Sequence, residues 1–165
     1  MLHWLWLSTL IVFLDQVTKY RISEILAVCE PGNCASIVLL PVFEFTRLHN
    51  TGAAFSFLDD AGGWQRWMFA AISTGVSTVL IVWLYRLTVQ ERWLAIALSV
   101  VLGGAIGNLI DRVTLGYVVD FILVHYGNYY FPAFNLADSA ITIGAGIMIL
   151  DMLFSKPSQA TENIQ

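Results

Sequence analysis

The sequence predicts an all-α integral membrane protein with four transmembrane helices, a small β-hairpin or sheet outside the membrane, and a second long loop on the same side. The composition supports this class, because 58% of residues are hydrophobic, 12% are charged and the mean hydropathy is +0.71. Soluble domains carry about 25% charged residues. Two windows, 67–84 and 93–110, contain no charged residue. Each is long enough to cross a hydrocarbon core of about 30 Å.

The four spans are expected at about 4–22, 66–86, 93–112 and 135–154, within a single domain of residues 1–154. The first and the last reach spanning length only by including Asp15 and Asp138, respectively. The first span is expected to be retained, because no Lys or Arg precedes Lys19 and no Ala-x-Ala cleavage site follows. Residues 155–165 are polar and are expected to form a disordered tail.

The connection between the first two spans carries an alternating pattern. Phe43 and Phe45 alternate with polar residues, and Phe55 and Phe57 repeat the alternation after the turn residues of segment 50–52. This period of two predicts a small hairpin. Its aromatic face would rest on the membrane surface, hold a bound lipid, or pack against the helices.

The two cysteines, Cys29 and Cys34, flank a Pro-Gly turn in the same connection. They could close a small disulfide loop in an oxidising compartment, or remain free thiols. A zinc site is disfavoured because no second pair of ligands lies nearby.

The other connection, 113–134, is expected to be a loop in which Asp120 interrupts an apolar stretch. With four spans, both long connections lie on the same side of the membrane. The polar residues of the spans gather toward that side. On the third span, Gly104, Asn108 and Arg112 are spaced by four and share one face.

An aspartate inside an apolar helix is costly, so Asp138 is a candidate functional residue. Asp15 is expected to pair with Lys19 four residues later, and Asp111 beside Arg112 is expected to be an exposed surface charge. Asp120 has no cation within five residues, which makes it the preferred partner for Asp138.

Two buried carboxyl groups that share one proton can activate water and polarise a carbonyl, as in aspartic proteases. The same two aspartates could instead serve a small proton-coupled transporter as a relay, or simply cap turns and the last helix. A non-enzymatic assembly factor that docks a partner on the glycine-rich third span is a further alternative. The net charge of −4 and the lack of a basic run disfavour nucleic acid as a partner.

Five blocks of sequence carry a family resemblance. In chain order they are Asp15-Gln-Val-Thr-Lys19, Asn50-Thr-Gly-Ala-Ala-Phe55, Gly103-Gly-Ala-Ile-Gly-Asn-Leu-Ile-Asp-Arg112, Val118-Val-Asp120-Phe and Phe134-Asn-Leu-Ala-Asp138-Ser-Ala. Together they resemble the motif set of bacterial lipoprotein signal peptidase, or signal peptidase II, over residues of about 15–143. Five blocks in the family's order make the resemblance specific.

The resemblance implies an intramembrane aspartic endopeptidase of the bacterial inner membrane. Such an enzyme cleaves diacylglyceryl-modified prolipoproteins just before the lipid-bearing cysteine. It implies cytoplasmic termini, periplasmic long connections, contact with membrane lipids, and neither a metal nor another cofactor. We expect a monomer.

By motif match, the resemblance also assigns roles to individual residues. Asp120 and Asp138 would be catalytic, and Asp15 and Lys19 structural. The residues expected to bind substrate are Asn50, Gly104, Asn108, Arg112 and Asn135.

Overall fold

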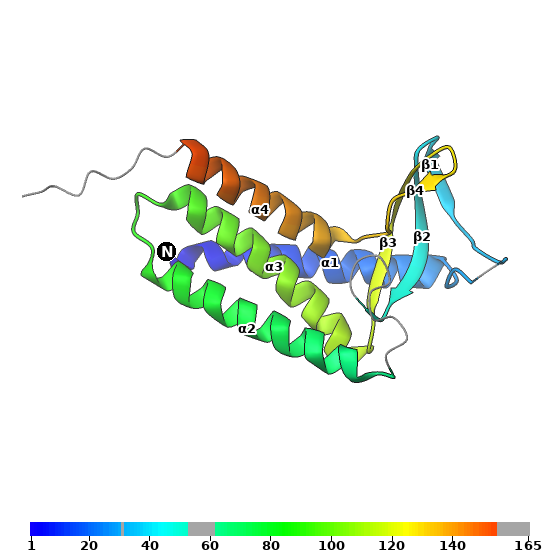
Figure 1. The fold of residues 1–165 in the computed structure, drawn as a ribbon, viewed down its shortest axis with the longest axis horizontal. Helices are drawn as coiled ribbons and strands as arrows, with labels where there is room; N and C mark the ends of the chain where they lie inside the picture. Colours follow the sequence, from blue (N-terminus) through cyan, green and yellow to red (C-terminus); the bar gives the residue numbers. More distant parts are fainter. Residues whose placement is uncertain (31, 53–61, 155–165) are drawn as a thin grey trace, which may run out of the picture.

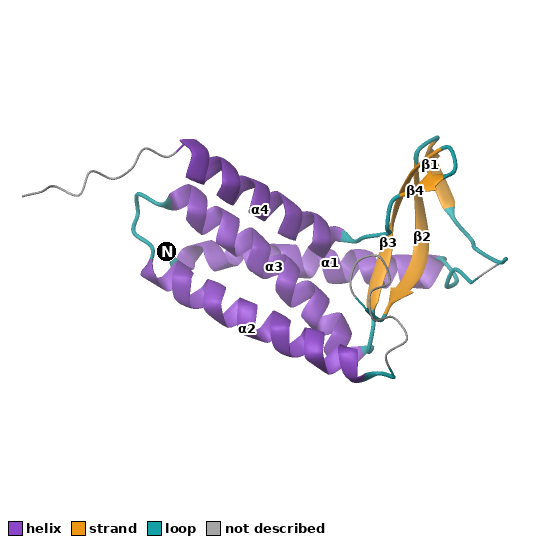
Figure 2. Cartoon of the chain, viewed as in Figure 1, coloured by secondary structure: helices purple, strands orange, loops and turns teal. Residues whose placement is uncertain are grey.

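The computed structural model describes residues 1–30, 32–52 and 62–154 (Figure 1). Four long helices lie alongside one another, and a small sheet sits at one end of the bundle (Figure 2). In chain order the elements are the 3-10 turn η1 (Leu2–Trp4), α1 (Leu5–Ile25), β1 (Ile37–Leu40), β2 (Phe43–Asn50), α2 (Trp64–Arg86), α3 (Arg92–Thr114), β3 (Val118–Tyr126), β4 (Tyr129–Tyr130) and α4 (Leu136–Phe154).

The helix α3 lies at the centre of the bundle and contacts the other three helices. Its Leu98 and Leu102 are buried against Leu84 of α2. The outer faces of the bundle are apolar as well, with exposed side chains such as Phe13, Val79 and Met152. Apolar side chains on the outside of a helix bundle are typical of a protein whose solvent is lipid.

Three helices, α2, α3 and α4, are long and apolar enough to cross a membrane. The first helix has 21 residues, so it is about 31 Å long at the usual rise of about 1.5 Å per residue. It carries Asp15 and Lys19 on a face that is buried inside the bundle. The structure thus contains three to four apolar helices, and the count of four spans stays a prediction.

The expectation of an all-α fold was wrong, because the chain also forms a four-stranded antiparallel sheet in the order β1-β2-β3-β4. The segment 113–134, expected to be a loop, supplies both β3 and β4. The first four residues of β3, from Val118 to Phe121, are all buried. A strand covered on both faces loses the alternation of polar and apolar residues by which strands are recognised.

The predicted strand around Phe43 and Phe45 exists as part of β2, but its partners differ from the expected ones. Strand β2 pairs with β1 on one side and with β3 on the other. The expected partner around Phe55 and Phe57 lies outside the described residues, as does the tail 155–165. Phe45 packs against a cluster of Ile22, Leu26 and Phe121, which attaches the sheet to the end of α1.

The two cysteines form the disulfide that was one of the two alternatives. It closes a short loop between α1 and β1. The sulfur of Cys34 lies 3.3 Å from the hydroxyl of Thr46 on β2. The disulfide therefore ties this loop to the sheet.

Candidate active site

Asp120 and Asp138 come together where β3 passes the beginning of α4. The backbone of Phe134 pairs with Ile122 of β3, through N–O distances of 2.8 and 3.1 Å. The next residue along the chain is Asn135, and α4 starts directly after it. The bridge at Phe134 thus places the first turn of α4, which carries Asp138, beside Asp120, 18 positions before Asp138.

Asn135 and Asp138 cap the first turn of α4 reciprocally. The side-chain oxygen of Asn135 accepts the backbone N–H of Asp138 at 2.9 Å. In return, Oδ2 of Asp138 accepts the backbone N–H of Asn135 at 3.1 Å. This is the geometry of a capping box, in which the third helical residue closes the cap. A carboxylate at this position is also stabilised by the helix dipole.

Asn135 also donates a hydrogen bond to Asp120. Its amide nitrogen donates to Oδ1 of Asp120 at 2.7 Å. The amide of Asn50, at the end of β2, donates to Oδ2 of Asp120 at 2.9 Å. The amide of Asn108 on α3 donates to Oδ1 of Asp138 at 2.7 Å. Within the described residues, every oxygen of the two carboxyl groups therefore accepts one N–H, and Asn135 bridges the pair.

Burial sets the electrostatics of this pair. Asp120 is only 3% exposed, whereas Asp138 is half-buried. Burial, together with the neighbouring charge of Asp138, raises the pKa of Asp120 to about 7. The amide donors of Asn50 and Asn135 act in the opposite direction, since they stabilise the ionised form. A carboxyl group with such a pKa can hold or release a proton near neutral pH.

Arg112, from the last turns of α3, is half-buried beside the pair. Its guanidinium lies over the ring of Phe69, 5.3 Å from the ring centre, and it donates weakly to the carbonyl of Asn108 at 3.4 Å. Within the part of the chain that the structure describes, it forms no ion pair.

Asp15 and Lys19 pair as the sequence predicted, at 2.8 Å, and they are buried. Lys19 also contacts Asp111 at 2.9 Å and donates to Oδ1 of Asn108 at 3.0 Å. Asp15 accepts the backbone N–H of Ala137 at 3.0 Å and thereby links α1 to α4. Asp111, expected to be an exposed charge, is 2% exposed, so that interpretation was wrong.

The glycines of α3 permit this close arrangement of helices. Gly104 is buried, and a Cβ there would collide with the carbonyl of Ala137 and with Ile141 at 2.7 Å. A Cβ at Gly107 would lie 2.6 Å from the carboxylate of Asp15. Gly104 was expected to bind substrate, and the structure places it in the contact between α3 and α4.

The residues predicted for the site thus fall into three groups. Those that meet at the aspartate pair are Asn50, Asn108, Asp120, Asn135 and Asp138, with Arg112 beside them. Asp15 and Lys19 form the buried ionic layer next to it, and Gly104 lies between helices. Sequence reasoning missed Asp111 and Gln16, which belong to that ionic layer. The signal that could have found Gln16 is its place between Asp15 and Lys19 in an otherwise apolar helix.

Two further features bear on ligand chemistry. Among residues 1–30, 32–52 and 62–154, no three His, Cys, Asp or Glu side chains are grouped so that they could hold a metal ion.

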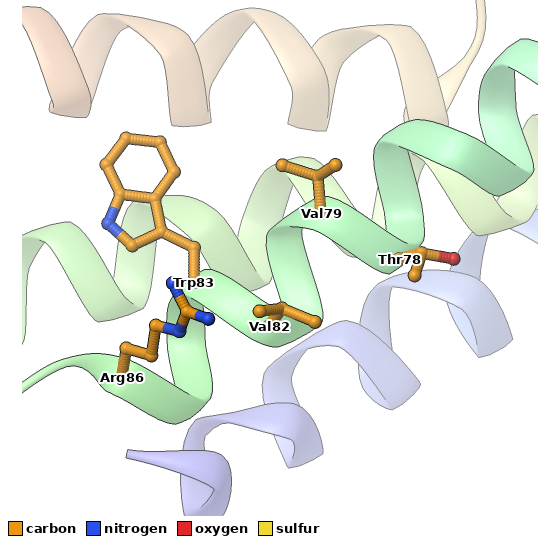
Figure 3. Close-up of a pocket in the computed structure, with 5 residues that line it drawn as sticks. All are labelled: Thr78, Val79, Val82, Trp83 and Arg86. Atoms are coloured by element: carbon orange, nitrogen blue, oxygen red, sulfur yellow. The ribbon is translucent and has the colours of Figure 1, made fainter.

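A shallow groove of about 310 Å³ is lined by five residues of α2: Thr78, Val79, Val82, Trp83 and Arg86 (Figure 3). This groove lies toward the end of α2, whereas the beginning of α2, at Arg66, contacts the end of α3 that carries Arg112. The groove is separate from the aspartate pair.

Comparisons with known proteins place these features in a family. Residues 7–154 match the family model described as signal peptidase (SPase) II. A lipoprotein signal peptidase of Pseudomonas syringae pv. tomato is 57% identical over 164 residues, which cover 98% of this chain and 92% of the relative. One of Pseudomonas putida is 58% identical over 160 residues, covering 96% of this chain and 91% of the relative.

Solved structures agree with the sequence comparisons. A structure described as a bacterial membrane enzyme superposes with a TM-score of 0.81 and 30% sequence identity, covering 99% of this chain and 94% of the other. A second structure with the same description gives a TM-score of 0.78 at 31% identity, covering 93% and 94%. The helices and the small sheet together therefore form the fold of a membrane enzyme.

Proposed function

The chain belongs to the signal peptidase II family, and we propose that it cleaves prolipoproteins as an aspartic endopeptidase, on the N-terminal side of the diacylglyceryl-modified cysteine. The observation that carries the aspartic mechanism is the bridged pair: Asn135 donates to Asp120 and exchanges two hydrogen bonds with Asp138. Two carboxyl groups are held by fixed donors, and one of them has a pKa of about 7. One of the two can therefore act as a general acid and the other as a general base.

We assign the resting proton to Asp120 and the negative charge to Asp138. Burial of Asp120 favours its neutral form. Asp138, in the N-terminal turn of α4, accepts the backbone N–H of Asn135 and the amide of Asn108, which hold it in place as the base. A protonated carboxyl oxygen still has a lone pair, so Asp120 can accept from Asn50 and Asn135 while it donates its own proton elsewhere.

The reaction then needs no group beyond water and the two aspartates. Asp138 takes a proton from water as the water oxygen attacks the scissile carbonyl carbon. Asp120 donates its hydrogen bond, and then its proton, to the carbonyl oxygen, which yields a tetrahedral diol. As the C–N bond breaks, the proton on Asp138 passes to the leaving amine, and one diol proton returns to Asp120. The products are a signal peptide with a new carboxyl end and a lipoprotein with a free amino group on its cysteine.

The surroundings of the pair suit a membrane-embedded substrate. Asp120 lies on β3 and Asp138 in the first turn of α4, and the sheet meets the bundle at that end of α4 (Figure 1). The outer faces of α2 and α4 are apolar. A signal helix and two acyl chains could reach this end by moving sideways through the lipid. Arg112 would bind the polar region of the substrate, and Asn50, Asn108 and Asn135 would hold the aspartates while they contact the substrate backbone.

We further propose the membrane placement expected for the family. The chain would lie in the bacterial inner membrane as a monomer with four spans, cytoplasmic termini and a periplasmic sheet. The disulfide between Cys29 and Cys34 supports this orientation, because disulfides persist in the oxidising periplasm.

The test is cleavage of a diacylglyceryl-modified precursor by the purified protein in detergent. The wild type should shorten the precursor, and Asp120→Asn and Asp138→Asn should leave it intact while the proteins stay folded. Glu24→Gln is the matched control, since Glu24 forms an exposed ion pair with Arg21 on α1, and it should cleave normally. Proton transport by reconstituted protein without any cleavage would favour the transporter alternative instead.

A further inference from the structure

Asp111 lies on the last turns of α3, buried between α1 and the beginning of β3. Three donors converge on its carboxylate. Oδ2 contacts Lys19 at 2.9 Å and accepts the backbone N–H of Val119 at 3.1 Å. Oδ1 accepts the side-chain amide of Gln16 at 2.8 Å.

The hydrogen bond to Val119 fixes the strand that carries Asp120. On the same edge of β3, the N–H groups of Phe121 and Ile122 both donate to the carbonyl of Phe134, at 3.1 and 2.8 Å. Asp120 therefore lies between two anchored positions, one held by Asp111 and the other by the segment that leads into α4. Loss of the first anchor leaves the strand attached on this edge only beyond Asp120.

Through its contact with Lys19, Asp111 also affects Asp138. The ammonium group that binds Asp111 also donates to Oδ1 of Asn108 at 3.0 Å. With its oxygen fixed in this way, the amide nitrogen of Asn108 points at Asp138, to which it donates at 2.7 Å. The orientation of Asn108 thus depends on where Asp111 and Asp15 hold the lysine.

We propose that Asp111 is a positioning residue for the aspartate pair: it places Asp120 through Val119 and orients the donor to Asp138 through Lys19 and Asn108. This inference rests on the proposed function and deepens it. A carboxylate suits this position, because both of its oxygens accept and all three of its partners donate. An asparagine would turn one N–H₂ group toward a donor, so it would lose at least one of the three bonds.

Asp111→Asn tests the proposal through kinetics and exchange together. We expect kcat to fall about 10- to 100-fold with KM within about 3-fold of the wild type, because positioning acts in the transition state rather than in binding. Amide hydrogen exchange in the peptide covering residues 117–123 should be faster. Glu24→Gln, which removes one exposed carboxylate from α1, should change none of these quantities.

The pH profile adds a readout that a merely structural residue would not move. The charged groups near Asp111 are Lys19 and Asp15 from α1 and Arg112 from its own helix, and Asp120 follows its partner Val119 on β3. Without the negative charge of Asp111, the positive charge of Lys19 acts more strongly on Asp120 and lowers its pKa. The fall in rate at alkaline pH, where Asp120 loses its proton, should therefore move to lower pH. A limb that stays in place, or moves to higher pH, would overturn the proposal.

The remaining outcomes separate this inference from the proposed function. If the wild type does not cleave, the proposed function fails and this inference fails with it. If the wild type cleaves and Asp111→Asn retains its kcat, or changes only KM, the positioning role alone is refuted. Should Asp111→Asn not fold, Gln16→Met removes one of the three donors and should lower kcat about 2- to 5-fold at unchanged KM. An unchanged kcat in that variant would refute the role equally.

Discussion

Asn135 offers a way to separate the stability of α4 from the chemistry of the aspartate pair. Its side-chain oxygen caps the helix by accepting from Asp138, and its amide nitrogen donates to Asp120. Asn135→Ala removes both bonds, and Asn135→Ser keeps an oxygen that can cap while it removes the donor to Asp120. Serine is about as good a helix cap as asparagine.

The size of each effect follows from the hydrogen bond that is lost. Loss of the cap costs about 1 kcal/mol of stability. Loss of a hydrogen bond that leaves a buried carboxyl oxygen unpaired costs about 1–3 kcal/mol. If the second amount is felt in the transition state, it corresponds to a fall in kcat of about 5- to 100-fold, since about 1.4 kcal/mol is one factor of ten.

Two assays in the same detergent decide between these effects. Thermal unfolding should show Asn135→Ala less stable than the wild type, with Asn135→Ser close to it. Single-turnover cleavage should be slow in both variants, because both lack the donor to Asp120. A folded Asn135→Ser protein that cleaves within about 3-fold of the wild-type rate would refute the claim that Asn135 supports the pair.

The remaining predictions concern pH, helix contact and the disulfide. Because the pKa of Asp120 is raised to about 7 and its proton is needed, kcat/KM should decline as pH rises through about 7; a rate that keeps rising above pH 8 would contradict this. The stabilising contribution of this proton should be full below the usual value of 3.8 and should disappear as pH rises toward 7, so the pH dependence of unfolding should weaken in Asp120→Asn. Gly104→Ala should cost about 1–3 kcal/mol of stability and slow cleavage, because its Cβ meets the carbonyl of Ala137, whereas Gly75→Ala, with open space around it, should do neither; equal unfolding temperatures of these two variants would refute the contact. Replacing Cys29 and Cys34 by serine should cost about 2 kcal/mol, from the entropy of a loop closed by two cysteines five positions apart, and should leave cleavage in place, whereas loss of cleavage in a folded variant would contradict this.

The helices could be predicted from sequence because their signal is local. The charge-free windows 67–84 and 93–110 can be recognised from composition alone, and they lie within α2 and α3, respectively. The sheet was harder to predict, because β3 is covered on both sides at its start and Asp120 interrupts its apolar run. Strand β3 pairs with β2 across about 70 to 80 residues of chain, and no local pattern encodes that pairing.

The residues of the candidate site also differ in whether local sequence predicts them. The pair of Asp120 and Asp138 could be predicted, because each is an acid in an apolar segment without a neighbouring cation. Asp111 was misread because Arg112 is next to it in sequence, yet on a helix adjacent residues point in different directions. Its actual cation, Lys19, comes from another helix, 92 positions earlier. The carboxylate with which a lysine pairs depends on the tertiary structure, so it cannot be predicted from local spacing.

Single-turnover cleavage by the wild type, Asp120→Asn, Asp138→Asn and the double variant tests the central claim most directly. A diacylglyceryl-modified precursor is mixed with excess protein in detergent, and the cut position is read by mass spectrometry. If the two aspartates act as one unit, each single variant should lose at least about 10⁴-fold in rate and the double variant no more than the worse single one. A folded single variant that keeps a few per cent of the wild-type rate, with the same cut position, would contradict the account.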